Sequence, residues 1–342
     1  MAAVPVLTLR TKGSTTQYAG LTRQNGQMPT PIDPAVALAP RLPSPLQRVH
    51  DDRLAGRGVE LWLKRDDLVH PAVPGNKWRK LALNLTAALD QGHSRLLTFG
   101  GAYSNHIRAV AAAGAAVGLG TVGVIRGDEL ARAERNWSLA RAEGYGMELA
   151  FWDRARFRET LRGLAEPETV QGLEERWGRC YVLPEGGTNV AAARGATEIV
   201  SELVADLPGL GPGDVVCCAV GTGGTLAGIA AALPEGARAL GVAVVKGARY
   251  LDGEVANLHE RGWGRTFANW RIDHDHHGGG YGRVPAGLAA FAEDFEARHG
   301  LAVERRYVAK MLRCVYGLAG GSWLPPGSRV TAVITGPADP VQ

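Results

Sequence analysis

Two almost uninterrupted apolar segments constrain the fold of this 342-residue chain more than any other feature. Residues 214–220 (DVVCCAV) and 237–245 (ARALGVAVV) carry the aliphatic and β-branched side chains typical of strands, and a helix is predicted from Thr222 between them. A strand that is apolar on both faces is buried on both faces, as in a parallel sheet that helices cover. The neighbours Cys217 and Cys218 should then point to opposite faces of their strand, which makes them poor disulfide partners.

The same alternation of strand and helix continues through most of the chain, which predicts an α/β fold with right-handed crossovers. Further strands are expected at 59–64, 95–99, 121–126, 147–151, 180–183 and 329–334, and helices at 77–91, 104–117, 134–144, 155–164, 190–205, 285–299 and 308–319. The first 45 residues carry many Pro, Thr, Gly and Gln residues with little periodicity, so we expect a partly ordered N-terminal arm there.

Composition and charge exclude several classes of function. The 38 basic and 34 acidic residues give a net charge of +4, and without a basic run this balance argues against a nucleic-acid partner. The longest uncharged run, 109–125, is shorter than the roughly 20 residues that a membrane span needs. The N-terminus has no signal-peptide pattern, and the four cysteines include no C-x-x-C pair. We therefore expect a cytoplasmic protein without a membrane segment or a zinc site.

A glycine-rich loop follows the buried strand at 214–220. Its residues, Gly221, Thr222, Gly223, Gly224 and Thr225, lead into a helix, so backbone N–H groups can converge on an anion at the helix N-terminus. The dinucleotide fingerprint would need a glycine where Leu226 stands, and a P-loop would need a lysine that the loop lacks. The loop therefore predicts a phosphate cup without a nucleotide signature, and a turn with no ligand is the alternative.

Two further segments place polar residues where ligands bind in α/β sheets, beyond the carboxyl ends of the strands. GNKWRKL (75–81) opens a helix with Lys77 directly after a glycine and an asparagine, which suits a lysine that must reach into a site. TFGGAYSNHIRAV (98–110) runs from a strand through glycines into a helix at Ser104 and Asn105, and an ordinary helix cap is the alternative there. No G-x-S-x-G occurs, which excludes the nucleophile turn of α/β-hydrolases.

The segment RIDHDHHGGGYGRV (271–284) contains three histidines, His274, His276 and His277. They have no partner motif elsewhere in the chain, so we expect a surface loop rather than a metal site. Tyr281, which follows three glycines, is the more interesting residue of this segment.

Taken together, KRDDL, GNKWRKL, GGAYSNH, PEGGTN, VGTGGT and GGYG resemble, in this order, the pyridoxal 5'-phosphate (PLP) enzymes of the tryptophan synthase β-like fold, fold type II. The nearest branch is the 1-aminocyclopropane-1-carboxylate deaminase/D-cysteine desulfhydrase family, over residues 45–336. The resemblance implies a large PLP-binding domain formed by 1–87 and 191–342, with a smaller α/β domain inserted at 88–190. It also implies a homodimer.

The resemblance also implies a role for each site residue. Lys77 would form the Schiff base with PLP and then act as a base. The cofactor phosphate would contact Lys80 and the loop of Gly221, Thr222, Gly223, Gly224 and Thr225, and the phenolic oxygen would contact Asn105. Ser104 would face the substrate carboxylate or the lysine. Tyr281 and Tyr307 would lie beside the substrate, and Thr335 would contact the pyridine nitrogen.

The chain departs from the family pattern after Tyr307, where Val308 and Ala309 stand. The deaminases carry a glutamate beside that tyrosine, which contacts the pyridine nitrogen. Pro337 also replaces a glycine that usually follows Thr335. We therefore expect α,β-elimination or deamination of a small amino acid to ammonia and a 2-oxo acid, with D-cysteine ahead of 1-aminocyclopropane-1-carboxylate. A racemase, a dehydratase, a β-replacement enzyme and a non-catalytic PLP-binding protein stay open as alternatives.

Overall fold

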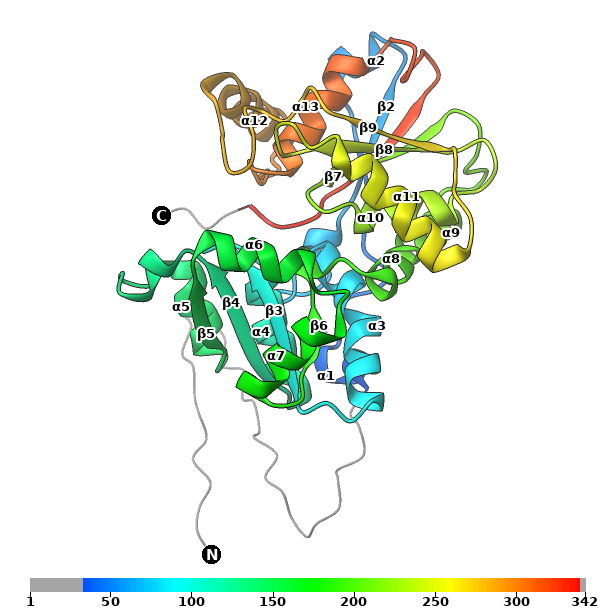
Figure 1. Cartoon of the computed structure of the whole chain (residues 1–342). Coiled ribbons are helices and arrows are strands. Elements are labelled where there is room, and N and C mark those ends of the chain that lie inside the picture. Colours follow the sequence, from blue (N-terminus) through cyan, green and yellow to red (C-terminus); the bar gives the residue numbers. More distant parts are fainter. Residues whose placement is uncertain (1–32, 339–342) are drawn as a thin grey trace, which may run out of the picture.

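The computed structural model describes residues 33–338, which contain two separate sheets. The larger sheet has six strands in the order β1-β2-β10-β7-β8-β9 (Figure 1). Their bounds are β1 Leu46–Val49, β2 Glu60–Lys64, β7 Asp214–Val220, β8 Arg238–Ala243, β9 Trp270–Asp273 and β10 Arg329–Val333. All neighbours pair in parallel except β1, which is antiparallel to β2. The predicted α/β fold with parallel sheets is therefore confirmed.

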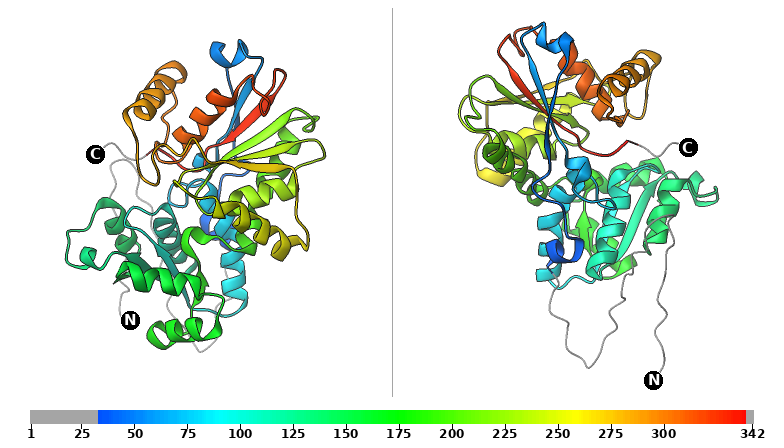
Figure 2. Two further views of the ribbon diagram at one scale, coloured as in Figure 1. Left: turned by 45° about the horizontal axis from the view of Figure 1, so that its top comes forward. Right: turned by 180° about the vertical axis from the view of Figure 1, so that it is seen from behind.

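The smaller sheet is entirely parallel, in the order β5-β4-β3-β6. Its strands are β3 Arg95–Gly100, β4 Gly120–Arg126, β5 Glu148–Trp152 and β6 Tyr181–Leu183. Figures 1 and 2 show this sheet and its helices as a lobe beside the larger sheet. All four strands fall inside the predicted inserted domain, but the boundaries at 88 and 190 stay a prediction.

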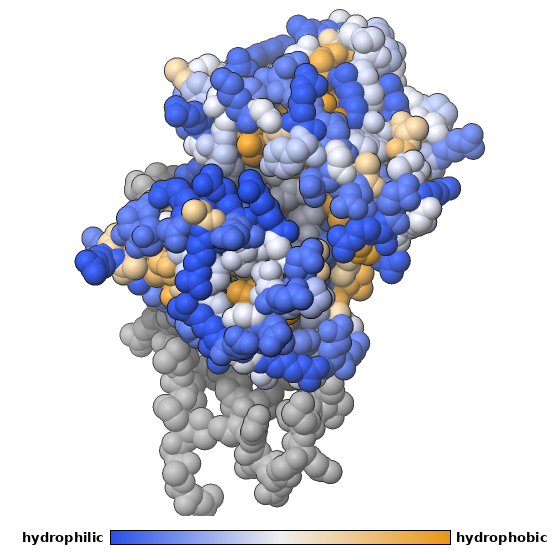
Figure 3. Space-filling model, viewed as in Figure 1, coloured by the Kyte–Doolittle hydropathy of each residue, from blue (hydrophilic) through white to orange (hydrophobic). Residues whose placement is uncertain are grey.

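Helices cover both sheets. Their bounds are α1 Pro34–Leu38, α2 Asp52–Ala55, α3 Asn76–Asp90, α4 Asn105–Val117, α5 Trp137–Gly144, α6 Arg154–Arg162, α7 Pro167–Trp177, α8 Val190–Ala196, α9 Glu198–Asp206, α10 Gly224–Ala232, α11 Tyr250–Trp263, α12 Ala286–His299 and α13 Val308–Leu318. No helix in the described part of the chain has the length and apolar character to cross a bilayer. Hydrophilic side chains cover most of the face in Figure 3.

Strand β7 is buried along its whole length, and its two faces belong to different cores. Cys217 packs in a cluster with Met311 of α13, whereas Cys218 packs with Leu226 and Ile229 of α10. Both cysteines are free thiols. The predicted opposite orientation is confirmed, and β7 carries the glycine loop at its carboxyl end.

Helix α3 is fixed at its start by a close backbone approach. Gly75 has a φ of +66°, and a Cβ placed there would lie 1.8 Å from the carbonyl oxygen of Thr335. Only glycine fits such a position. The first turn of α3 therefore lies against the end of β10, which brings Lys77 and Thr335 into one region.

A buried ion network around Arg79 also anchors helix α3. Arg79, which is 0% exposed, bonds Asp66 at 3.1 Å, Glu198 at 2.7 Å and Glu202 at 2.7 Å. Lys64 of β2 reaches Glu202 at 2.8 Å. Because Glu198 and Glu202 belong to α9, the network ties β2, α3 and α9 together.

Several elements differ from the sequence expectation. The helix predicted at 190–205 is two helices, α8 and α9, that meet at Thr197. The strands β1 and β9 and the helices α1, α2, α7 and α11 were not predicted. Residues 271–273 of the predicted loop belong to β9, and the rest of that loop is irregular up to Pro285. Residues 1–32 of the expected N-terminal arm lie outside the described residues.

Candidate active site

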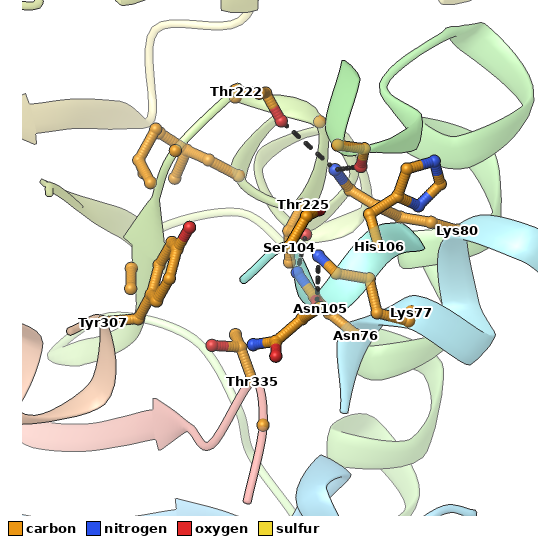
Figure 4. Close-up of a pocket in the computed structure, with 18 of the residues that line it drawn as sticks. Asn76, Lys77, Lys80, Ser104, Asn105, His106, Thr222, Thr225, Tyr307 and Thr335 are labelled. Carbon is orange, nitrogen blue, oxygen red and sulfur yellow. Dashed lines mark hydrogen bonds between the residues drawn. The ribbon is translucent and has the colours of Figure 1, made fainter. Parts of the chain in front are cut away.

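A cavity lies where the carboxyl ends of β3, β7 and β10 meet the start of α3 (Figure 4). It is lined by Asn76, Lys77, Lys80, Ser104, Asn105, His106, Gly186, Ala219, Val220, Gly221, Thr222, Gly223, Gly224, Thr225, Leu226, Glu304, Tyr307, Thr335 and Gly336. The lining includes every predicted site residue except Tyr281. Segments that are far apart in the sequence therefore converge on one site.

Lys77 lies in the first turn of α3 and its amine faces the cavity. Its Nζ donates to Oδ1 of Asn76 at 3.1 Å, and Nδ2 of Asn76 donates to Oγ1 of Thr225 at 2.8 Å. Burial lowers the pKa of Lys77 to about 8, because the charged amine loses its hydration. At neutral pH the amine is consequently far more nucleophilic than a surface lysine.

The glycine loop leads into the N-terminus of α10. No described side chain caps this helix, and its N-cap residue, Gly223, has a φ of +84°. A Cβ on Gly223 would lie 2.9 Å from Val255, and one on Gly224 would lie 3.1 Å from Thr188. The glycines thus keep the first-turn N–H groups of α10 accessible from the cavity, and such a helix end favours an anion.

Lys80 stands one turn after Lys77, at the edge of this loop. Its Nζ donates to Oγ1 of Thr188 at 2.7 Å, the carbonyl of Gly186 at 2.9 Å and Oγ1 of Thr222 at 3.3 Å. Burial, followed by the charge of Lys77, holds the pKa of Lys80 well below its usual range. The side chain therefore reaches the loop that we expect to bind an anion.

Helix α4 presents its first residues to the cavity. Oγ of Ser104, the N-cap residue, accepts the backbone N–H of Ile107 at 3.3 Å. The cap that the sequence offered as an alternative is thus present, and the capping residue also lines the cavity. The next residue, Asn105, accepts a hydrogen bond from Arg108 at Oδ1.

His106 forms part of the cavity wall near Lys77 and Lys80. Oγ1 of Thr98 donates to the carbonyl of Leu183 at 3.0 Å, so it accepts the hydrogen bond that joins it to Nε2–H of His106 at 2.8 Å. Burial, with the charges of the two lysines, holds the pKa of His106 well below its usual range. The ring is therefore neutral, with its proton on Nε2 and a lone pair on Nδ1.

Tyr307 stands at another wall of the cavity, and the ring of Tyr281 packs against it. Tyr307, at the start of α13, lines the cavity, and burial followed by the proximity of Tyr281 raises its pKa well above the usual range. Tyr281 is 49% exposed and lies outside the cavity wall. Its ring packs nearly perpendicular to that of Tyr307, with 6.2 Å between the centroids. The structure thus places Tyr281 against Tyr307 and outside the cavity lining, and its predicted position beside the substrate stays a prediction.

A family model described as pyridoxal-phosphate dependent enzyme matches residues 39–336. The chain belongs to this family. A putative 1-aminocyclopropane-1-carboxylate deaminase of Pyrococcus abyssi is 30% identical over 269 residues, which cover 76% of this chain and 79% of that protein. A D-cysteine desulfhydrase of Yersinia pestis (strain Pestoides F) is 32% identical over 210 residues, which cover 59% of this chain and 62% of that protein.

A solved structure described as an ACC deaminase homologue superposes with a TM-score of 0.73 at 25% identity and covers 89% of this chain and 94% of that chain. Threonine deaminase isoform 2 of Solanum lycopersicum, with a TM-score of 0.62 at 16% identity, shares the fold over 90% of this chain and 87% of its own. The resemblance to this family that the sequence motifs indicate is confirmed. This chain is a fold type II, PLP-dependent enzyme of the deaminase/desulfhydrase group, and its cofactor is PLP.

The cavity fits PLP on three counts. It contains a helix N-terminus that no described side chain caps, in a loop that admits no Cβ at Gly223. It contains a buried amine of lowered pKa, Lys77, for the aldehyde carbon of the cofactor. It also contains the amide of Asn105 and the hydroxyl of Thr335 as hydrogen-bonding groups for the ring. A phosphate, an aldehyde and a polar ring thus each find suitable groups in this PLP enzyme.

Among the described residues, Glu304 is the one carboxylate that lines the cavity, and the sequence motifs did not predict it. This side chain is 3% exposed, and its carboxylate accepts the backbone N–H groups of Arg306 at 2.7 Å, Tyr307 at 2.6 Å and Val308 at 3.1 Å. The Val308 side chain turns into the core. The family glutamate position is thus apolar and buried, while a carboxylate four residues earlier faces the site.

The polar residues and glycines of the cavity that were also missed are Asn76, His106, Gly186 and Gly336. Three of them adjoin predicted residues, so a search of the neighbours of each motif residue would have found them. Gly186 belongs to the PEGGTN motif, to which no role was given. Its carbonyl accepts from Lys80.

The three histidines after β9 each contact a nearby group. Nε2 of His274 lies 2.7 Å from Asp252, Nδ1 of His276 lies 2.9 Å from Asp273, and Nδ1 of His277 accepts the N–H of Gly279. Among the described residues, the ligand atoms of Asp273, His276 and Cys314 lie within 4.8 Å of one another. Oδ1 of Asp273 already accepts the backbone N–H groups of Asp275 and His276, so a turn accounts for this carboxylate.

Proposed function

We propose that this enzyme catalyses α,β-elimination from a small amino acid that carries a leaving group on its β-carbon, with D-cysteine as the leading substrate. The net reaction of D-cysteine and water would give hydrogen sulfide, ammonia and a three-carbon 2-oxo acid. Ring opening of 1-aminocyclopropane-1-carboxylate is the second candidate, because relatives in the group are named as deaminases of that compound.

Lys77 supports this proposal as the base. When bound, PLP withdraws electrons from the α-carbon of an attached amino acid. The Nζ of Lys77 then takes the α-proton, for which a buried amine with a pKa of about 8 is suited at neutral pH. Asn76 holds this Nζ within the cavity, which fixes the position of the proton acceptor.

The start of α4 and Tyr307 support the binding of an amino acid. Ser104 lies at the N-terminus of α4, where the helix dipole favours the substrate carboxylate. The raised pKa of Tyr307 keeps its hydroxyl protonated, so this hydroxyl can donate to the substrate or to the departing group. Tyr281 would orient the Tyr307 ring through their edge-to-face contact.

The observation that carries the choice of elimination is the exchange at position 308. Val308 is buried in the core, so the carboxylate that the deaminases place beside the pyridine nitrogen is missing at this position, while Thr335 lines the cavity. A hydroxyl does not hold a proton on the ring nitrogen as a carboxylate does. With Thr335 as its partner, the ring of bound PLP would be the weaker electron sink, which would still suffice for a thiol that departs soon after the α-proton.

Glu304 is the reason to keep the second candidate. Its carboxylate lines the cavity, although three backbone N–H groups already stabilise its charge. If this carboxylate serves the ring nitrogen, ring opening gains the stronger sink that it needs.

The test is a comparison of kcat/KM for D-cysteine, β-chloro-D-alanine and 1-aminocyclopropane-1-carboxylate, with ammonia and the 2-oxo acid measured in each case. Elimination predicts faster turnover of both β-substituted alanines. Faster turnover of the cyclopropane would overturn the assignment. The Glu304→Gln variant then tells whether that carboxylate is responsible.

We also propose a cytoplasmic homodimer with an inserted domain at 88–190. The resemblance to the family supports the homodimer. The separate four-stranded sheet formed by β3, β4, β5 and β6 supports the inserted domain. Light scattering on the purified protein tests the dimer, and a stable mass of one chain would contradict it.

A further inference from the structure

Asn105 and Arg108 lie on the same face of α4, three residues apart. Nη2 of Arg108 donates to Oδ1 of Asn105, and Nη1 donates to Oγ of Ser138 at 2.8 Å. The guanidinium carbon also stands 4.2 Å from the centre of the Trp137 ring. Because Trp137 and Ser138 begin α5, one arginine connects the start of that helix to a residue that lines the cavity.

These contacts decide which way the Asn105 amide points. A guanidinium has only donors, so the amide atom that faces it must be the oxygen. The amide nitrogen of Asn105 then points away from Arg108. Nδ2 of Asn105 lies 3.8 Å from the position that a Cβ would take on Gly336, which lines the cavity.

We propose that Arg108 is a positioning residue that fixes the Asn105 amide with its N–H group toward the cofactor. The inference rests on the proposed function, in which Asn105 binds the phenolic oxygen of PLP. A free asparagine could present either its oxygen or its nitrogen, and an oxygen would repel the phenolic oxygen. A charged donor at Oδ1 also polarises the amide and strengthens the N–H that it presents.

The anchoring of Arg108 explains why an arginine suits this position. Ser138 is fully buried, and the side chain of Asn136 accepts the backbone N–H groups of Ser138 and Leu139 in the first turn of α5. The guanidinium stacks on one residue and donates in two directions at once, which a lysine ammonium cannot do in a plane. The amide orientation is thereby linked to the packing of α5.

The test uses Arg108→Met, Arg108→Lys and the control Arg135→Met. Arg135 also stacks on a ring of the same lobe, 4.6 Å from the centre of Phe151, but it contacts no cavity residue among those described. Three quantities are measured: the Kd of PLP for the cofactor-free protein, the visible absorption maximum of the bound cofactor, and the pH at which this band titrates. The Arg108→Met variant should raise the Kd about ten-fold, as expected for one hydrogen bond to a charged group.

Arg108→Met should also shift the titration of the band, because a weaker donor at the phenolic oxygen changes the proton affinity of the lysine linkage. Arg108→Lys should fall between Arg108→Met and the wild type, and Arg135→Met should match the wild type. In an Asn105→Ala background, the further change Arg108→Met should have no effect on either quantity, because Arg108 acts through Asn105.

A wild-type Kd and titration in Arg108→Met would overturn the inference, as would an undiminished effect in the Asn105→Ala background. If circular dichroism shows that Arg108→Met does not fold, the Lys variant decides by the same two criteria. A wild-type protein that forms no borohydride-reducible adduct at Lys77 would overturn the proposed function together with this inference. Unchanged variants of a protein that does bind PLP would overturn this inference alone.

Discussion

Asn76 and Thr225 are joined by a hydrogen bond of 2.8 Å, from Nδ2 to Oγ1, across 149 residues of sequence. The same amide accepts from the Nζ of Lys77 at its oxygen. The start of α3 and the start of α10 are therefore linked through one side chain, which fixes the distance between the reactive amine and the phosphate loop.

The Asn76→Asp change tests this link with almost no change in shape. A carboxylate beside Lys77 should raise the pKa of its amine, and the same charge should repel the cofactor phosphate. We expect the Kd of PLP to rise by at least about ten-fold, measured by spectroscopic titration of the cofactor-free protein. Asn76→Ala, which removes the bonds without adding charge, should weaken binding less. Equal effects of the two changes would show that charge is not what matters at this position.

The glycine loop gives a second prediction. A valine at position 223 must adopt a φ near +84° and would bring its Cβ to 2.9 Å from Val255, so the backbone of the loop should shift. We expect Gly223→Val to weaken PLP binding by at least about ten-fold, since strain of this kind costs about 1–3 kcal/mol. Gly224→Val should also weaken binding, because its Cβ would lie 3.1 Å from Thr188 beside the loop.

The matched control for these variants is Gly253→Ala in α11, where no described atom lies within 4 Å of the new Cβ. It should leave the affinity unchanged and stabilise the helix slightly. Unchanged PLP affinity in both valine variants would refute the phosphate cup.

The buried ion network gives a prediction about stability. Arg79→Met removes the cation that balances Asp66 and Glu202, both of which are largely or wholly buried. Breaking one side of such a network should lower the free energy of unfolding by about 3–5 kcal/mol, measured by urea denaturation. Arg48→Met is the control, because its ion pair with Glu60 is about half exposed and should contribute less than about 1 kcal/mol. A loss of similar size in both variants would contradict a special role for burial.

Local sequence pattern predicted the elements that have strong periodicity, and it failed where tertiary contacts decide. The strand predicted at 214–220 matches β7 residue for residue, because no polar residue interrupts it after Asp214. The short strand β1 has a half-exposed surface and no alternation that marks it, and its pairing with β2 makes it a strand.

The site residues divide in the same way. The glycine loop follows β7 directly and Asn105 follows β3 closely, so topology alone brings them to one edge. Lys77 reaches the same edge from α3, after the longer segment that leaves β2. Glu304 precedes a helix after an irregular segment, and its place in the cavity depends on how α13 packs. Tyr281 was predicted beside the substrate, yet only its contact with Tyr307 ties it to the site.

The last prediction concerns the pH dependence of cofactor capture by Lys77. Burial lowers the pKa of its amine to about 8, from a usual value of 10.5. Only the neutral amine attacks the aldehyde, so the rate constant of PLP capture by the cofactor-free protein should rise about ten-fold per pH unit below that pKa and level off above it.

Stopped-flow absorbance measures this rate, and borohydride reduction followed by peptide mapping identifies the modified lysine. The Lys77→Ala variant should lose the reducible adduct, while Lys80, whose Nζ is held by Thr188 and the Gly186 carbonyl, should not replace it. The lowered pKa of Lys77 also predicts how the stability of the cofactor-free protein depends on pH. Between pH 8 and 10.5 the unfolded chain binds more protons at this lysine than the folded one, so the cofactor-free protein should gain stability as the pH rises through that window. A capture rate that keeps rising to pH 10, or an adduct that survives in Lys77→Ala, would contradict a buried amine of lowered pKa at this position.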